Sequence, residues 1–125
     1  KCIASTVVHY INEVKSDMAK FQGANYADVK NFTDIAKHWS EMKGFALGLQ
    51  FSPYSPFRTE MGDLAQITYS DQTASLAELF NWMGDAPVLA DATDEQKIQF
   101  VAGLDAARNL LQAAYNFDAT NVASW

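Results

Sequence analysis

The sequence predicts an all-α fold, a four-helix-type bundle in which residues 1–125 form a single domain. Three observations predict this class. Apolar side chains recur in steps of three and four along several long segments, which is typical of helices with one buried stripe. Glycine and proline clusters separate those segments. No segment alternates apolar and polar residues convincingly enough to indicate a strand.

The first predicted helix covers residues 2–22, and Gly23 ends it. Its buried stripe is Ile3, Val7, Tyr10, Val14, Met18 and Phe21. His9 and Glu13 fall on the opposite side, and His9 is interpreted as a solvated surface histidine rather than a ligand. Asn25 is expected to cap the helix that follows.

The second predicted helix runs from about residue 26 to residue 50. Its core stripe is Phe32, Ile35, Trp39, Met42, Ala46 and Leu49. Pro53 and Pro56 end the helix and hold residues 51–57 extended. This aromatic-rich loop is expected to be stiff. Its rings either form a contact surface or close over the end of the core.

The rest of the chain is expected to add two helices. One covers residues 75–83, after a shorter helical turn over residues 63–69. Thr93 and Gln96 form a capping box that begins the last helix, which runs to about residue 114. This helix buries Phe100, Leu104, Ala107, Leu110, Leu111 and Ala114. The terminal Trp125 is expected to pack back onto the helices.

Composition excludes several classes of function. The formal charge of −6 argues against nucleic-acid binding, because no cluster of Lys and Arg is present to displace counterions from phosphates. No apolar run approaches the roughly 20 residues of a membrane span. One cysteine forms no internal disulfide. Lys1 and Cys2 lead straight into helical periodicity, so the chain is expected to be cut from a longer precursor.

A polar strip borders the core stripe of the second helix. Asp34, His38 and Glu41 line this strip at helical spacing. Gly44 and Gly48 lie beside it and leave a shallow hollow. Glycine inside a helix costs about 0.5–1 kcal/mol relative to alanine, so two of them need a reason. Either they allow close helix–helix approach while His38 and Glu41 pair, or the strip binds a metal or acts as base and carboxylate.

Several specific chemistries are absent from the sequence. The His-Glu-x-x-His zinc signature is missing, and two histidines cannot make a three-histidine site. The sequence also lacks a nucleophile elbow, a phosphate-binding glycine loop and a paired-cysteine motif. No catalytic residue and no site for an organic cofactor is therefore predicted. A divalent metal ion or iron at His38, Glu41 and Asp34 would need further ligands, from Asp63, Asp105 or a missing part of the protein.

Two stretches of sequence resemble known families. Ala36-Lys37-His38-Trp39-Ser40-Glu41 resembles the Gly-x-His-x-x-Glu motif of the imelysin family, with alanine in place of the glycine. The wider strings KHWSEMKGFALGLQFSP, MGDAPVLA and ARNLLQAAYNFDATNVASW resemble an uncharacterised bacterial envelope family, domain of unknown function 4856. Together these strings cover about half of the chain.

The resemblance implies a periplasmic or cell-surface protein built from two helical bundles, of which this chain would be about one. It also implies a link to iron or haem acquisition, with His38 and Glu41 at the motif positions. Many such proteins are lipid-anchored, which implies a lipid anchor outside this chain. The expected partner is the remaining half of the same precursor or another envelope protein.

Three functions follow as hypotheses. The first is an envelope binding protein that holds a metal ion, haem or a partner at the His38–Glu41 strip. The second is a structural or protein-interaction domain without a ligand, in which this pair joins two helices. The third is an imelysin-type metallopeptidase, which only the family's label suggests. Binding is placed ahead of catalysis.

Overall fold

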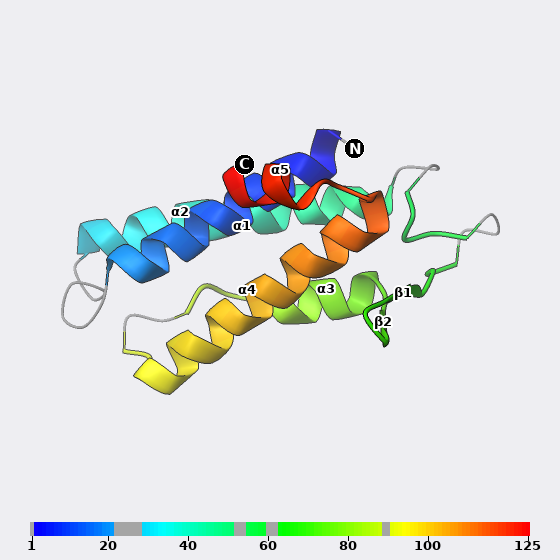
Figure 1. Cartoon of the computed structure of the whole chain (residues 1–125). Coiled ribbons are helices and arrows are strands. Elements are labelled where there is room, and N and C mark those ends of the chain that lie inside the picture. Colours follow the sequence, from blue (N-terminus) through cyan, green and yellow to red (C-terminus); the bar gives the residue numbers. More distant parts are fainter. Residues whose placement is uncertain (1, 22–28, 52–54, 60–62, 89–90) are drawn as a thin grey trace.

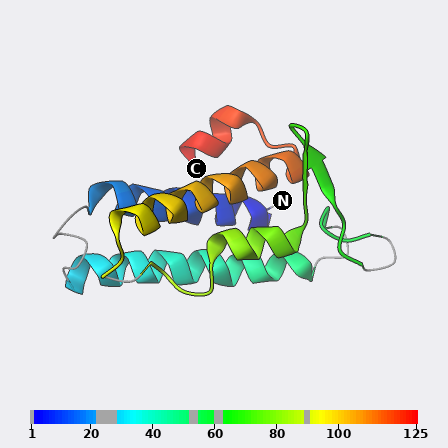
Figure 2. The same ribbon diagram turned by 90° about the horizontal axis from the view of Figure 1, so that it is seen from below.

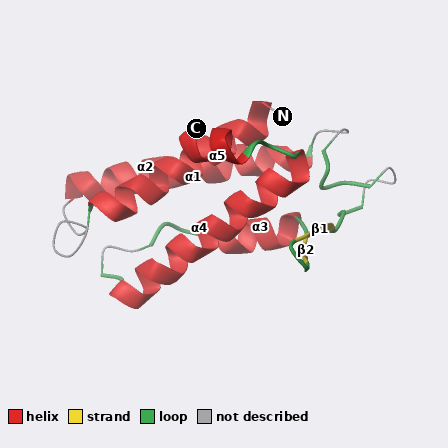
Figure 3. Ribbon diagram, in the orientation of Figure 1, coloured by secondary structure: helices red, strands yellow, loops and turns green. Residues whose placement is uncertain are grey.

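The computed structural model describes residues 2–21, 29–51, 55–59, 63–88 and 91–125. The described chain is mostly helical (Figures 1 and 3). The helices are α1 (Cys2–Lys20), α2 (Val29–Leu47), α3 (Leu76–Met83), α4 (Asp94–Tyr115) and α5 (Ala119–Ser124). A short 3₁₀ helix, η2 (Gly48–Gln50), extends α2. None of the helices in the described ranges combines the length and apolar character needed to cross a membrane.

The helices pack as neighbouring pairs. α1 and α2 lie side by side and run in opposite directions (Figure 1). α4 packs against both α1 and α3, and α5 returns over α1 (Figures 1 and 2). The all-α prediction is confirmed at this level.

The core is formed by the apolar stripes of these helices. Most of the predicted core positions are buried, namely Val7, Val14, Met18, Ile35, Trp39, Met42, Ala46, Leu49, Leu79, Met83, Leu104, Ala107, Leu110 and Leu111. Val8 and Ile11 are buried as well, so the buried face of α1 is wider than one stripe. Ile3 is an exception, because it is exposed at the start of α1.

α3 is held against α2 at its C-terminal end. The indole Nε1 of Trp39 donates to the Met83 carbonyl at 2.9 Å. Lys43 Nζ donates to the carbonyls of Phe80 and Gly84 at 3.2 and 2.5 Å. Burial lowers the pKa of Lys43, and the carboxylate of Asp85 partly opposes that shift. The ammonium group gives the Gly84 carbonyl, just past the end of α3, a donor, and adds a second donor to the Phe80 carbonyl, which already accepts from Gly84 N at 3.1 Å.

The segment before α3 forms a β-hairpin, so the predicted helical turn over residues 63–69 and the absence of strands are both wrong. β1 (Ile67–Tyr69) pairs antiparallel with β2 (Gln72–Ala74). Ser70 and Asp71 form the two-residue turn with φ of 47° and 63°. Such turns require positive φ at both positions, which Asn-Gly signals much more clearly than Ser-Asp does. The strands are three residues each, too short for a visible alternation.

Two predictions for the chain from α4 onward are confirmed, namely the cap of α4 and the packing of Trp125. Thr93 and Gln96 form the predicted capping box. The tail adds one helix that was not predicted, α5, which Asp118 caps. Trp125 packs edge-on against Phe117 at 4.9 Å between ring centroids, which confirms that the terminal ring packs back.

The segment between α2 and the hairpin is described only in part. Phe57 is fully buried, so one ring of this loop closes over the core. Phe51 is 77% exposed. Closure over the core is therefore confirmed for Phe57, whereas a contact surface in this loop stays a prediction. Residues 52–54 lie outside the described residues, as does the predicted cap at Asn25.

Candidate functional site

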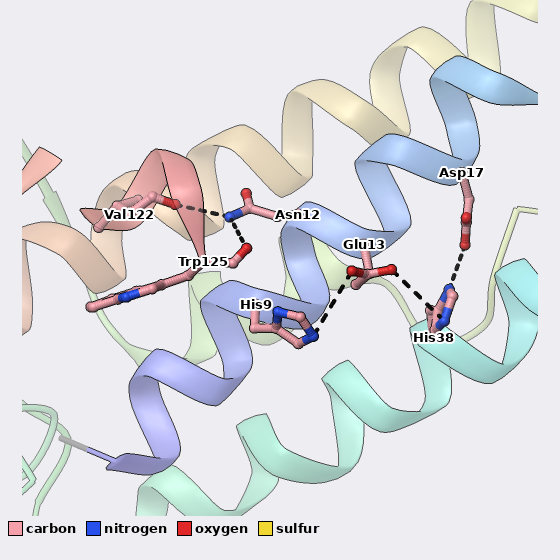
Figure 4. Close-up of polar contacts among 7 residues, drawn as sticks. All are labelled: His9, Asn12, Glu13, Asp17, His38, Val122 and Trp125. Carbon is pink, nitrogen blue, oxygen red and sulfur yellow. Dashed lines mark hydrogen bonds and ion pairs between the residues drawn. The ribbon is translucent and has the colours of Figure 1, made fainter. Parts of the chain in front are cut away.

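His38 lies at the contact between α1 and α2, and its partners come from α1 (Figure 4). Its Nδ1 donates to Asp17 Oδ2 at 2.6 Å. Its Nε2 lies 4.0 Å from Glu13 Oε2. The two helices therefore meet through an imidazole held between two carboxylates.

The polar contact continues along α1 to a second imidazole. His9 Nε2 lies 3.9 Å from Glu13 Oε1, so Glu13 stands between the two histidines (Figure 4). Residues 9, 13 and 17 are spaced four apart and share one face of α1. We call His9, Glu13, Asp17 and His38 the polar row. His9 and Glu13 are nearly half exposed, whereas only 25% of the His38 side chain and 12% of the Asp17 side chain are exposed.

Glu41 pairs with a different residue from the one expected. The expected His38–Glu41 couple is wrong among the described residues, because both contacts of His38 are carboxylates of α1. Glu41 instead lies near the hydroxyl of Tyr10 on α1. Burial raises the pKa of Tyr10, and the carboxylates of Glu41 and Glu13 raise it further. Side chains three apart on a helix can diverge toward different neighbours when the adjacent helix offers two partners.

Asp34, the third predicted metal ligand, is half-buried one turn before His38 and lies outside the polar row. The structure thus brings His38 together with two carboxylates that the sequence did not single out. The regular spacing of His9, Glu13 and Asp17 is the signal that could have found them. It was overlooked because residue 17 stands next to the apolar stripe, where a carboxylate is unexpected.

The polar row contains imidazole and carboxylate groups, which are the donor types of a metal site. A carboxylate that binds Nδ1 of a histidine is the usual way in which proteins orient an imidazole toward a metal. In the part of the chain that the structure describes, however, no three His, Cys, Asp or Glu residues converge closely enough to hold a metal ion. These residues do not make a complete metal site, and the arrangement acts instead as a hydrogen-bonded link between α1 and α2.

Gly44 of α2 and Gly48 of η2 do not serve close packing of the described helices. A Cβ placed on Gly44 meets nothing within 4 Å, and one on Gly48 meets only the Ile3 side chain at 4.0 Å. Close helix approach occurs elsewhere, at Gly103 of α4, where a Cβ would lie 2.7 Å from the Trp82 carbonyl oxygen. Close approach within the described fold therefore does not explain Gly44 or Gly48.

Exposed apolar side chains surround these glycines. Ile3, Phe45 and Phe51 are all exposed, and Phe45 stacks on Tyr10 with ring centroids 5.7 Å apart. We call Ile3, Phe45, Phe51 and the two glycines the glycine face. It lies beside the N-terminal end of α1, where α2 ends (Figure 1).

Comparison with known proteins adds no relative. No family model matches the chain, and no curated protein or solved structure matches it. The resemblance to imelysins and to the envelope family therefore stays a prediction that rests on the motifs alone.

Proposed function

We propose that this chain is a helical protein-interaction domain of the bacterial cell envelope. In this proposal the glycine face receives an amphipathic helix from outside the chain. The observation that carries it is the pair Gly44 and Gly48, which the described packing of the chain does not require.

Gly44 and Gly48 lower the stability of the helical segment that contains them. Each disfavours the helix by about 0.5–1 kcal/mol relative to alanine, and alanine fits both positions. Residues four apart lie on the same side of a helix. Two such glycines leave a flat strip of backbone that another helix can approach closely. A binding surface is the use that accounts for both positions together.

The apolar side chains beside the strip supply the attraction. A partner helix would cover Phe45 and Phe51, whose rings are now in contact with water over much of their surface. Aromatic residues at the centre of an interface contribute most of its binding free energy. Scattered exposed apolar residues are ordinary, but here Phe45 adjoins Gly44 in the chain, Phe51 follows η2, and the Ile3 side chain lies 4.0 Å from a Cβ placed on Gly48.

The polar row supports this surface from within the protein. The Asp17–His38 bond fixes α2 against α1, and the glycine face includes side chains of both helices. In this role His38 positions the surface and does not touch the partner.

The wider identity forms part of the proposal and rests on the resemblance. The chain would be a four-helix-type bundle, one of the two bundles of an imelysin-like protein in the periplasm or on the cell surface. The partner helix would come from the remaining half of the precursor or from another envelope protein. Cell fractionation tests the location, and recovery of the chain in the cytoplasm would overturn that part.

Photo-crosslinking in the native host tests the interaction. A photoreactive phenylalanine analogue replaces Phe45, and a matched control carries it at Asn109, an exposed position of α4. We expect a discrete adduct from position 45 that maps by mass spectrometry to one helical segment, and none from position 109. The absence of an adduct at position 45, or the same adduct at both positions, would overturn the proposal.

Metal binding at His38 is the second candidate, favoured by the carboxylate that orients its Nδ1. Since the described residues do not complete a site, further ligands would have to come from elsewhere. Calorimetry with iron, zinc and copper salts on the wild type and on His38→Ala decides it. Identical blank titrations would remove both this candidate and the metallopeptidase alternative, which needs the same ion.

A further inference from the structure

The solvent-exposed side of α2 carries no acidic residue, although the chain has 15 acidic residues against nine basic ones. The two carboxylates of α2, Asp34 and Glu41, are half-buried, and Glu41 lies near Tyr10 of α1. The exposed residues of α2, continued to the end of η2 and the residue after it, are Lys30, Thr33, Lys37, Ser40, Gly44, Phe45, Leu47 and Phe51. This side of the helix therefore differs in charge from the protein as a whole.

Most of these exposed residues form one strip along the helix axis. They follow one another in alternating steps of four and three, a spacing that keeps side chains on one line of a helix. It is also the pattern along which a second helix packs lengthwise. The residues of this strip, which we call the α2 strip, are Thr33, Lys37, Ser40, Gly44, Leu47 and Phe51. The α2 strip shares Gly44 and Phe51 with the glycine face.

The two ends of the α2 strip differ in chemistry. Leu47 is 42% exposed and Phe51 is 77% exposed, so the C-terminal end is apolar. Lys37 lies toward the N-terminal end, and it forms no ion pair with any residue that the structure describes. Lys37 and Phe51 lie roughly 20 Å apart along the axis, or about four helical turns. A ligand that matches both ends must be elongated, apolar at one end and negatively charged at the other.

We propose that the partner helix of the glycine face is an acidic amphipathic helix that lies along the α2 strip. Its apolar end would cover Leu47 and Phe51, and an Asp or Glu side chain near its other end would pair with the Lys37 ammonium group. This inference rests on the proposed function and adds the charge and the direction of the partner. A pair of opposite charges at one end of an interface fixes its register and discriminates against other partners.

An anionic membrane surface matches the same strip less well. A bilayer meets the whole facing surface of a protein, and its attraction for proteins depends on clusters of lysine and arginine. The net charge of −6 opposes the approach of this chain to anionic lipid. A single helix contacts only the strip, where no carboxylate is exposed. The charge distribution therefore favours a helix over a membrane.

Photo-crosslinking of the whole protein in the native host tests this inference, with the photoreactive phenylalanine analogue in place of Phe51. We expect the adduct to map by mass spectrometry to a helical segment outside residues 1–125 that carries an Asp or Glu about four turns from the crosslinked residue. An adduct with a lipid, with residues 1–125 of a second copy, or with a segment that lacks acidic residues would overturn the inference.

Charge variants test the role of Lys37 in the same crosslink. Lys37→Glu should lower the yield of the position-51 adduct by at least about threefold, because it sets like charges against each other, whereas Lys37→Arg should retain the yield. Lys20→Glu makes the same change of charge at an exposed position of α1 and should leave the yield unchanged. Circular dichroism shows that each variant is folded.

The outcomes separate this inference from the proposed function. A position-51 adduct that folded Lys37→Glu leaves undiminished would contradict the acidic partner, while a discrete adduct from position 45 would still support the interaction surface. The absence of any adduct from position 45 would remove the proposed function, and this inference with it.

Discussion

His38 of α2 donates a 2.6 Å hydrogen bond to Asp17 of α1, and this polar pair joins the two helices that pack most extensively against each other. The carboxylate is the more deeply placed partner, with 12% of its side chain exposed against 25% for the imidazole. A buried carboxylate without a partner lowers the stability of the fold far more than a partly exposed imidazole without one. The bond therefore stabilises the fold chiefly by satisfying Asp17.

This difference in burial predicts that His38→Ala and Asp17→Ala lower the free energy of unfolding by different amounts. His38→Ala should lower the free energy of unfolding by about 2–3 kcal/mol, because it strands the Asp17 carboxylate. Asp17→Ala should cost only about 1–2 kcal/mol, since water can replace the lost partner of His38. Urea unfolding of both variants and of the double variant measures these values. Asp34→Ala is the control and should change stability by less than about 0.5 kcal/mol. Equal costs for the two single variants would contradict this account.

The glycines predict stability changes of opposite sign. Gly44→Ala and Gly48→Ala should each raise the free energy of unfolding by about 0.5–1 kcal/mol, because the added Cβ has room and alanine favours the helix. Gly103→Ala should lower it by about 1–3 kcal/mol, because its Cβ would lie 2.7 Å from the Trp82 carbonyl oxygen. Thermal and urea unfolding check both signs. A loss of stability in Gly44→Ala would show that the strip is needed within the fold.

Removal of the Lys43 ammonium group should weaken the packing of α3 against α2. Lys43→Met should lower stability by about 1–2 kcal/mol, since the Gly84 carbonyl loses the lysine donor and the Phe80 carbonyl keeps only Gly84 N. The matched control is Lys37→Met, at an exposed position of the same helix, which should change stability by less than about 0.5 kcal/mol.

Lys43 also predicts a pH dependence. Burial lowers its pKa in the folded state below the usual 10.5, so the unfolded state binds more protons between the folded and the usual value. In that alkaline window Lys43 makes stability rise with pH. The wild type should therefore gain stability with pH relative to Lys43→Met as the lysine deprotonates. If the free energies of unfolding of the two proteins changed with pH in parallel, the pKa of Lys43 would not be lowered.

The capping box of α3 predicts a second titration of the same sign, in the acid range. Hydrogen bonds from the Ser75 side chain and backbone lower the pKa of Glu78 below 4.5. Its contribution to stability is thus present above pH 4.5 and is lost as the pH falls through the folded value. Ser75→Ala should cost about 0.5–2 kcal/mol at neutral pH, and the cost should shrink in acid. Gln99→Ala, exposed on α4, serves as the control for the acid measurements.

The long helices could be predicted from the sequence because their apolar spacing is regular and their caps are local. Thr93 and Gln96 are three residues apart in the chain, and the geometry that they form follows from their spacing alone. The hairpin could not be predicted in the same way. Its turn uses Ser70 and Asp71 in a left-handed conformation that these residue types adopt uncommonly.

The candidate site was predictable only in part. His38 could be selected because it borders a core stripe, but its partner depends on how α1 lies against α2, which periodicity does not determine. Glu41 was chosen as that partner from its position on the same helix, and Asp17 took the role from the neighbouring helix. Ile3 was assigned to the core from the same periodicity, although it is 45% exposed at the start of α1.

The central claim is that the glycine face binds a partner helix. The crosslink from position 45 in a variant of Gly44 tests it most directly. Gly44→Gln adds an uncharged side chain that favours a helix and occupies open space, so the fold should be at least as stable as the wild type. The account predicts that the adduct from position 45 falls at least tenfold in this variant, while its melting temperature is retained. An undiminished adduct in the folded variant would contradict it.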